Sequence, residues 1–220
     1  MDQTNKRTMI DFERVFLVPI MFLLLVGSTA KLITTDPPDT PVRYGDLLGF
    51  AYQFLLICFY LSIVILLLVR HDAVAKSTRL APRALAYVAT FLPFLLPFAG
   101  GSPAGPVLAT TAVTLQASGM AFSAYSLLVL GRSFGVEPQV RRLVQTGPYR
   151  KIRHPLYVGE IVQLTGAVLF APAWAKLAIL LAIVALQGYR SIHEERLLEA
   201  NIPEYTQYKT ETKRFIPGIV

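Results

Sequence analysis

The longest uncharged stretch of the sequence reads ALAYVATFLPFLLPFAGGSPAGPVLATTAVTLQASGMAFSAYSLLVLG and occupies residues 84–131. A bilayer core about 30 Å thick is crossed by roughly 20 apolar residues of a helix, so this stretch is long enough for two crossings. Its middle, GGSPAGP at residues 100–106, is rich in residues that interrupt helices. The stretch therefore predicts two membrane-spanning helices joined by a tight turn.

Uncharged runs on either side predict further spans. Residues 15–30 and 47–69 each have the length of one crossing, and residues 156–189 form a last pair around APAW at 171–174. The chain is 54% hydrophobic and only 16% charged, which is typical of membrane proteins. We expect an all-α polytopic membrane bundle of about six transmembrane helices. Its last pair would be a short hairpin, followed by a cytoplasmic C-terminal amphipathic segment that could lie along the membrane surface.

The distribution of basic residues predicts the orientation. With six helices and the N-terminus inside, 18 of the 21 Lys and Arg residues fall on the side of the termini, and only Lys31, Arg43 and Lys176 fall on the other. Positively charged loops stay in the cytoplasm, so both termini are expected there. The net charge of +7 then describes a basic surface that faces anionic membrane lipids, where we place Arg141 and Arg142. No nucleic-acid-binding motif accompanies it.

The chain divides by character into two regions of one integrated domain. Residues 1–131 form a transmembrane scaffold of four helices, and residues 132–220 form the region that carries the chemistry. The second region begins with a 24-residue loop, 132–155, and loops of this length usually carry function or disorder. In the fourth predicted helix, small or weakly polar residues recur on one face: Ala112, Gln116, Gly119, Ser123 and Ser126. Such a face favours close packing against another helix. A substrate-lining role stays open for Gln116.

Two polar segments flank the last predicted hairpin. They read GPYRKIRHPLYVGE at residues 147–160 and YRSIHEERLLEANIPEYTQYKTETKRFIP at residues 189–217. The hairpin brings both to the cytoplasmic face, so one site can be built from them. Pro155 suits the first turn of a helix, whose positive end attracts an anion. Glu194 and Glu195 could bind a diol or an ammonium, or they could be a solvated pair, since charged helix ends are common at membrane surfaces.

Glu160 differs from the other charged residues of these segments. The predicted helix places it just inside the bilayer, with Gln163 and Ala167 on the same face. An ionisable side chain within a membrane is by default a candidate functional residue. We therefore predict that Glu160 is catalytic, and either Glu160 or a tyrosine of the site could act as a base.

The combined pattern GPYRxxRHPxYxG, a hydrophobic hairpin, RxxxEExxL, EYxxY and a final IP resembles the isoprenylcysteine carboxyl methyltransferase family. Its bacterial relatives and, more widely, the phospholipid methyltransferases share it. The resemblance covers residues 131–217. It implies an S-adenosylmethionine-dependent integral membrane methyltransferase, located in a bacterial inner membrane, with a lipophilic acceptor such as an isoprenylcysteine-type carboxylate, a thiol or a lipid. The sequence departs from relatives at residues 201–203, where Asn-Ile-Pro replaces a common Phe-Gly.

Carried over by position, the resemblance implies a set of residues that bind the cofactor: Tyr149, His154, Tyr157, Gly159, Glu194, Glu195, Tyr205 and Tyr208. Arg153 lies among them and is predicted, with Glu160, to be catalytic. S-adenosylmethionine offers a carboxylate for Arg153 or His154, a diol and an ammonium for the glutamates, and an adenine and sulfonium for tyrosine faces. The chain contains no Gly-x-Gly, so a Rossmann-type nucleotide site is not expected.

Two alternatives stay open. An NADPH-dependent membrane reductase of the sterol reductase type has a distantly similar C-terminal pattern, but such relatives carry Arg-Asp-Glu, Cys and Trp where this chain has residues 193–195, Leu198 and Tyr205. A non-catalytic lipid-binding or assembly protein could keep the same scaffold. The three histidines show no metal-ligand spacing and there is a single cysteine, so no metal site is expected.

Overall fold

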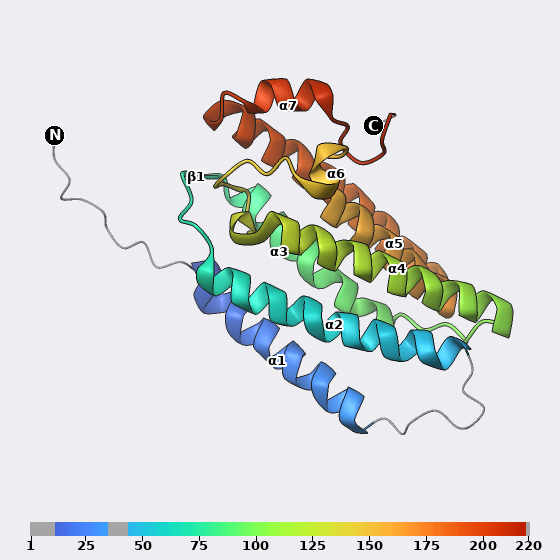
Figure 1. Ribbon diagram of the computed structural model, residues 1–220. Helices are drawn as coiled ribbons and strands as arrows, with labels where there is room; N and C mark the ends of the chain where they lie inside the picture. Colours follow the sequence, from blue (N-terminus) through green and yellow to red (C-terminus); the bar gives the residue numbers. More distant parts are fainter. Residues whose placement is uncertain (1–11, 35–43, 219–220) are drawn as a thin grey trace, which may run out of the picture.

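In the computed structural model, the described residues are 12–34 and 44–218. Lys6, Arg7 and Arg43, which contribute to the predicted orientation, lie outside them. The described residues form a bundle of long helices that run along one another, with short segments gathered at one end (Figure 1). The helices and 3-10 turns are α1 (Phe12–Thr34), α2 (Tyr44–Val69), α3 (Leu80–Phe91), η1 (Leu92–Phe98), α4 (Pro106–Leu130), η2 (Gly131–Ser133), η3 (Gly147–Arg150), α5 (Pro155–Phe170), α6 (Trp174–Asn201) and α7 (Tyr205–Glu211).

Five helical stretches of the described chain are long and apolar enough to cross a membrane: Glu13–Thr34, Gly49–Val69, Leu80–Phe98, Pro106–Ser133 and Trp174–Asn201. The remaining apolar helix, α5, has 16 residues and is shorter than a usual span. The bundle agrees with the prediction of about six helices, but only the first arm of the last pair is short. The second arm, α6, has 28 residues because its helix continues through the charged residues after Tyr189.

Proline and glycine interrupt the charge-free stretch at the expected place. The α-helical part of α3 ends at Phe91, and the chain continues as a 3-10 turn around Pro93 and Pro97, which lack a backbone N–H. The turn that follows uses Gly100 and Gly101 with φ of 71° and 98°. A Cβ on Gly101 would strike carbonyl oxygens of the α5–α6 turn, so only glycine fits there.

The small face of α4 packs against α5. A Cβ on Gly119 would strike the backbone of α5 at Gly159, and a Cβ on Gly159 would strike Ser123. Gly166, about two helical turns further along, meets α4 in the same way at Gln116. The prediction of a helix-packing face is therefore confirmed, and it explains why these two helices approach closely.

Loops and short elements cover one end of the bundle. The connection after α2 contains β1 (Ala75–Lys76), which pairs antiparallel with β2 (Gln139–Val140) in the long loop before α5. At the same end α7 lies across the last turns of α6 (Figure 1). The loop 132–155 is thus held by a strand pair and a 3-10 turn, and it forms one wall of the site described below.

Candidate functional site

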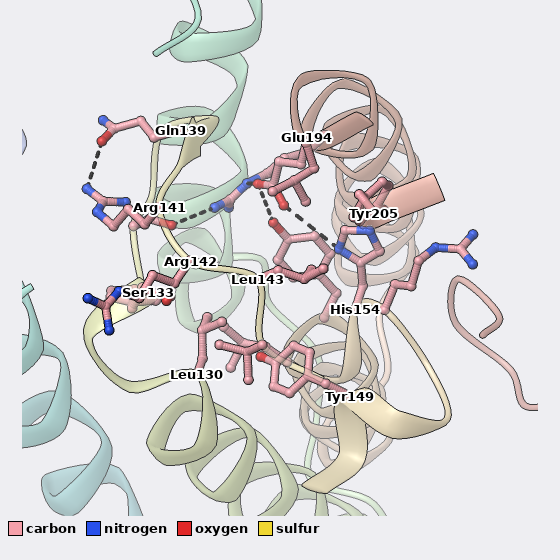
Figure 2. Close-up of a pocket in the computed structure, with 18 of the residues that line it drawn as sticks. Leu130, Ser133, Gln139, Arg141, Arg142, Leu143, Tyr149, His154, Glu194 and Tyr205 are labelled. Carbon is pink, nitrogen blue, oxygen red and sulfur yellow. Dashed lines mark hydrogen bonds and ion pairs between the residues drawn. The ribbon is translucent and has the colours of Figure 1, made fainter. Parts of the chain in front are cut away.

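A cleft of about 860 Å³, including its mouth, opens at the loop-covered end of the bundle. Its walls come from the loop at 133–144, the turn η3, the first turn of α5, the last part of α6 and the helix α7. Figure 2 shows Gln139, Arg141 and Arg142 of the loop on one side, and His154, Glu194 and Tyr205 on the other. Elements far apart in the sequence therefore meet at this cleft.

The two polar segments lie directly beside each other. The backbone N–H of Arg153 donates to the carbonyl of Lys213 at 2.8 Å, and that of His154 donates to the carbonyl of Arg214 at 3.1 Å. Immediately after these bonds, Pro155 begins α5 at the position where its missing N–H costs nothing. The expectation that the hairpin brings these segments together is confirmed.

Glu195 fastens the C-terminal segment to the start of α5. It is 2% exposed and accepts hydrogen bonds from Arg153 Nε at 2.9 Å and Arg214 Nη2 at 2.8 Å. His154 Nε2 lies 3.1 Å from the same carboxylate, which can only accept, so this nitrogen carries the proton. The hydrogen bond with Glu195 also raises the pKa of Arg214. Glu195 does not border the cleft, and its charge is used to hold the protein together.

Arg153 borders the cleft, but its donors serve the same junction. Besides Glu195, its guanidinium donates to the backbone carbonyls of Lys209 and Thr212. Thr212 is itself buried and donates back to the carbonyl of Tyr208 at 2.6 Å. The structure therefore places Arg153 at the joint between α5, α6 and the C-terminal segment.

Glu194 borders the cleft, whereas its neighbour Glu195 does not. Tyr157 donates to it from the phenol at 2.6 Å, and Arg190 donates from Nε at 2.8 Å. The guanidinium of Arg190 also lies 5.1 Å from the centre of the Tyr157 ring, a cation–π distance. The ring of His154 stacks on the ring of Tyr157, with 5.2 Å between the ring centres. An aromatic and charged surface of this kind can hold a cation.

Three buried tyrosines form the floor of the cleft. The phenol of Tyr208 donates to the carbonyl of Tyr149 at 2.7 Å, which locks α7 onto η3. Burial raises the pKa of Tyr208 to about 12, and it raises the pKa values of Tyr149 and Tyr205 as well, so all three phenols are neutral at physiological pH. The hydroxyl of Tyr205 is buried without a hydrogen-bond partner among the described residues. The tyrosine face of α7 is thus packed on the protein.

The opposite wall, the loop at 133–144, is held by a glutamate at the start of α1. Glu13 is 1% exposed and accepts hydrogen bonds from the backbone N–H groups of Val136 and Glu137 and from the guanidinium of Arg70. Glu137 is bound in turn by α3, since Arg83 donates to it at 2.9 Å. Burial alone would raise the pKa of Glu137, but hydrogen bonds from Arg83 and a nearby tyrosine outweigh it and hold the pKa below its usual value.

The assignment of Arg141 to the lipid surface is wrong. Arg141 is 7% exposed, borders the cleft, and donates to the backbone carbonyl of His71 at 2.9 Å and to Gln139 at 2.7 Å. The pairing of β1 with β2 draws this part of the loop inward, which the charge pattern did not predict. Arg142 is exposed, as expected, but it also borders the cleft (Figure 2).

A second cavity of about 930 Å³, including its mouth, lies among α1, α2, η1, α4, α5 and α6. It is lined mainly by apolar side chains and shares four wall residues with the cleft: Phe134, Leu156, Tyr157 and Arg190. Glu160 lines this cavity and accepts a hydrogen bond from the amide of Gln187 at 2.5 Å. The two cavities are therefore neighbours separated by a thin wall.

The structure sorts the residues predicted from sequence into three groups. Seven border the cleft, Glu160 lines the second cavity, and Gly159 and Glu195 line neither; the seven are Tyr149, Arg153, His154, Tyr157, Glu194, Tyr205 and Tyr208. Sequence reasoning missed the contributions of Glu137, Gln139 and Arg141, for which the length of the loop was the one signal. In the part of the chain that the structure describes, no three His, Cys, Asp or Glu residues are grouped so that they could hold a metal ion.

The five long apolar helices and their arrangement define a multi-pass integral membrane protein. Its fold is similar to that of a solved structure of the eukaryotic intramembrane Ras methyltransferase, isoprenylcysteine carboxyl methyltransferase. The TM-score is 0.51 at 20% sequence identity, over 91% of this chain and 74% of that one. This likeness confirms the fold expected from the two polar segments.

Residues 102–202 match the family model of the phospholipid methyltransferases. The matched region contains α4, α5, α6 and all of the cleft-lining residues outside α7. It supports a membrane methyltransferase, in agreement with the resemblance found from the motifs.

Two curated bacterial relatives match a shorter segment. The nickel-cobalt-cadmium resistance protein NccN of Alcaligenes xylosoxydans xylosoxydans is 40% identical over 78 residues. The cobalt-zinc-cadmium resistance protein CzcN of Cupriavidus metallidurans is 35% identical over 78 residues. Each alignment covers 35% of this chain, and the chain spans only about a third of the length of these relatives, 37% and 36%.

Proposed function

We propose that the protein is an S-adenosylmethionine-dependent methyltransferase that acts on a lipophilic acceptor at the membrane. The observation that carries the proposal is the pair of neighbouring cavities. One lies at the charged end of the bundle and is bordered by charged and aromatic side chains, and the other lies among the helices and is lined mainly by apolar side chains. Methyl transfer requires a polar cofactor and its acceptor to meet across a short distance, and the shared wall at Tyr157 and Arg190 allows this.

The cleft offers partners for each part of S-adenosylmethionine. Tyr149 and Tyr205 present aromatic surface for the adenine ring, and the hydroxyl of Tyr205 is a buried donor with no partner among the described residues. Arg142, exposed at the cleft, suits the carboxylate of the amino-acid part. Glu194 can hold the ammonium, and the rings of His154 and Tyr157 suit a sulfonium. The residues present therefore fit this cofactor.

S-adenosylmethionine supplies an electrophilic methyl group, so the protein itself has to orient the reactants and exclude water. Tyr157 and Arg190 are held by Glu194, and they form a rigid part of the wall where the two cavities meet. The tyrosines of the cleft are neutral at physiological pH and can donate hydrogen bonds. Positioning and preorganised dipoles are expected to supply most of the rate acceleration.

The predicted orientation gives each reactant its route. If the loop-covered end faces the cytoplasm, the cofactor enters the cleft from the aqueous side. The acceptor enters the second cavity from the bilayer, past the apolar surfaces of α2 and η1. Both termini then lie in the cytoplasm of a cell whose inner membrane holds the bundle.

Calorimetric titration of the detergent-purified protein with S-adenosylmethionine and, separately, with NADPH tests the proposal. We expect binding of the first and none of the second. The variant Glu194→Gln should bind S-adenosylmethionine about ten- to a hundredfold more weakly, because a charge-assisted hydrogen bond contributes roughly 1.5–3 kcal/mol.

The variant Glu204→Gln is the matched control, since Glu204 is exposed at the start of α7 and lines neither cavity. Its affinity should equal that of the wild type. Binding of NADPH instead of S-adenosylmethionine would indicate a reductase. Binding of neither would indicate a protein that uses the scaffold without catalysis.

A further inference from the structure

The second cavity contains buried polar atoms that the cofactor site does not use. Gln187 is 1% exposed; its amide nitrogen donates to Glu160, and its Oε1 has no hydrogen-bond partner among the described residues. The hydroxyl of Ser123, also 1% exposed, likewise has no hydrogen-bond partner among the described residues. Both side chains line the cavity. Buried polar atoms without partners are unfavourable, so these two indicate a ligand that pairs with them.

The carboxylate of Glu160 and the unpaired oxygen of Gln187 are hydrogen-bond acceptors in this cavity. An ionised carboxylate can only accept, so the Gln187 amide must turn its nitrogen to Glu160 and leave its carbonyl oxygen unpaired. Ser123 can accept or donate. A ligand that satisfies Gln187 must therefore donate a hydrogen bond.

One cation, Arg190, lies among the described residues that line this cavity. Its Nε donates to Glu194 at 2.8 Å, and its Nη2 donates to the carbonyl of Val136 at 2.6 Å. It faces Glu194 on the cleft side and the ring of Tyr157. Arg190 attracts Glu160 through space but makes no hydrogen bond to it among the described residues, so the carboxylate of Glu160 can still accept a hydrogen bond from a ligand in the second cavity.

The rest of the lining describes the body of that ligand. Apolar side chains surround the cavity from five helical elements, α1, α2, η1, α4 and α5, among them Met21, Ile63, Phe94 and Leu164. The wall shared with the cleft lies beside Tyr157, three residues from Glu160 on α5. An elongated apolar molecule would therefore present its polar end close to the cofactor cleft.

We propose that the methyl acceptor is an apolar molecule that ends in a nucleophile bearing a proton, a thiol or an amine, and that Glu160 receives this proton. The inference rests on the proposed function and deepens it. The acceptor's sulfur or nitrogen forms a bond to the methyl carbon while the bond from that carbon to the sulfonium sulfur breaks. The electron pair of the broken bond stays on the sulfonium sulfur, and the proton passes to the Glu160 carboxylate and then to solvent.

A carboxylate acceptor fits this cavity poorly. It would bring a second negative charge beside Glu160 in surroundings of low dielectric constant, where like charges repel strongly. It also carries no proton to donate to Gln187 or to Glu160. The cavity therefore discriminates between acceptors by the presence of a proton on the nucleophile.

Equilibrium dialysis of the cofactor-free, detergent-purified chain against radiolabelled dodecanethiol, dodecylamine and dodecanoate tests the discrimination, with protein-free micelles as the blank. We expect the thiol or the amine to bind at least about tenfold more tightly than dodecanoate. Glu160→Gln should abolish this preference, and Gln187→Leu, a second variant in case the first fails to fold, should weaken it. Glu211→Gln, on the exposed face of α7, is the matched control and should keep it.

Turnover with labelled S-adenosylmethionine then separates the thiol from the amine, because mass spectrometry of the product identifies the methylated atom. Glu160→Gln should lower kcat while calorimetric affinity for S-adenosylmethionine stays unchanged. Preferred binding or methylation of dodecanoate by the wild type would overturn the inference and leave the proposed function intact. Failure of the wild type to bind S-adenosylmethionine would overturn both.

Discussion

Adjacent glutamates on α6 have different tasks. Glu194 borders the cleft and is bound by Tyr157 and Arg190, whereas Glu195 is buried under the C-terminal segment and is bound by Arg153 and its neighbours. Consecutive residues of a helix point about 100° apart, so one can face a site while the other faces the protein. At this scale, the charge of Glu194 serves binding and the charge of Glu195 serves structure.

We expect Glu195→Gln to lower the free energy of unfolding by roughly 3 kcal/mol, because removing one member of a buried ion pair leaves its partners uncompensated. The C-terminal segment should also detach from α5. Thermal unfolding in detergent measures the first effect, and trypsin cleavage at Lys213 and Arg214 measures the second. A variant as stable and as resistant to trypsin as the exposed control Glu211→Gln would contradict the assignment.

At the scale of elements, the cleft depends on a loop that two distant helices hold in place. Glu13 of α1 binds the backbone of the loop at Val136 and Glu137, and Arg83 of α3 binds the side chain of Glu137. The strand pair β1–β2 adds a third attachment. The helices α1 and α3 therefore contribute to the site by holding the loop in place. Glu13 and Arg83, in the first turns of these helices, do not themselves border the cleft.

The variant Glu13→Gln tests this attachment. An amide places N–H groups where the loop and Arg70 also present donors, so roughly 3 kcal/mol of stability should be lost. Hydrogen exchange at residues 133–142 should become faster, and the KM for S-adenosylmethionine should rise more than kcat falls. Glu199→Gln, which removes only an exposed pair with Lys209, is the control. Unchanged exchange in the loop would show that Glu13 does not position it.

The lowered pKa of Glu137 predicts how acid acts on the same element. A carboxyl whose pKa is lower in the folded state stabilises the fold fully above its unfolded pKa of 4.5, and this contribution is lost as the pH falls through the lower folded value. Thermal unfolding measured from pH 6 down to about pH 3 should show the loss. In Glu137→Gln this part of the pH dependence should be absent, and an identical acid profile in the two proteins would contradict the prediction.

At the scale of the whole molecule, the bundle separates polar from apolar functions along its length. The cleft lies at the end that carries α7 and the strand pair, while the second cavity lies among the helices (Figure 1). Lys31 and Lys176, at the end of α1 and the start of α6, belong to the opposite end. The distribution of charge predicts that the cleft end faces the cytoplasm.

Reporter fusions test this orientation directly. Alkaline phosphatase and green fluorescent protein fused to either terminus should both give the signal of the cytoplasm, because the crossings are even in number when α5 and α6 form a hairpin. A signal from the opposite side at one terminus alone would mean that α5 does not complete the hairpin.

The amino-acid sequence by itself determined the helices, their interruptions and the meeting of the two polar segments. Hydropathy, proline and glycine act over short distances along the chain, and a hairpin necessarily brings its flanks together. The packing face of α4 also followed from local spacing, because residues three and four apart share one side of a helix. These features did not depend on knowing which distant residues touch.

Only the tertiary structure decided the direction of each charged side chain and the shape of the two cavities. Glu13 binds Val136 across 123 positions of sequence, and no local pattern predicts such a partner. Arg141 resembles any basic residue of a membrane surface until β1 and β2 pair and draw it inward. The second cavity exists because several helices leave space around Glu160 and Gln187, and the sum of side-chain volumes from distant segments sets that space.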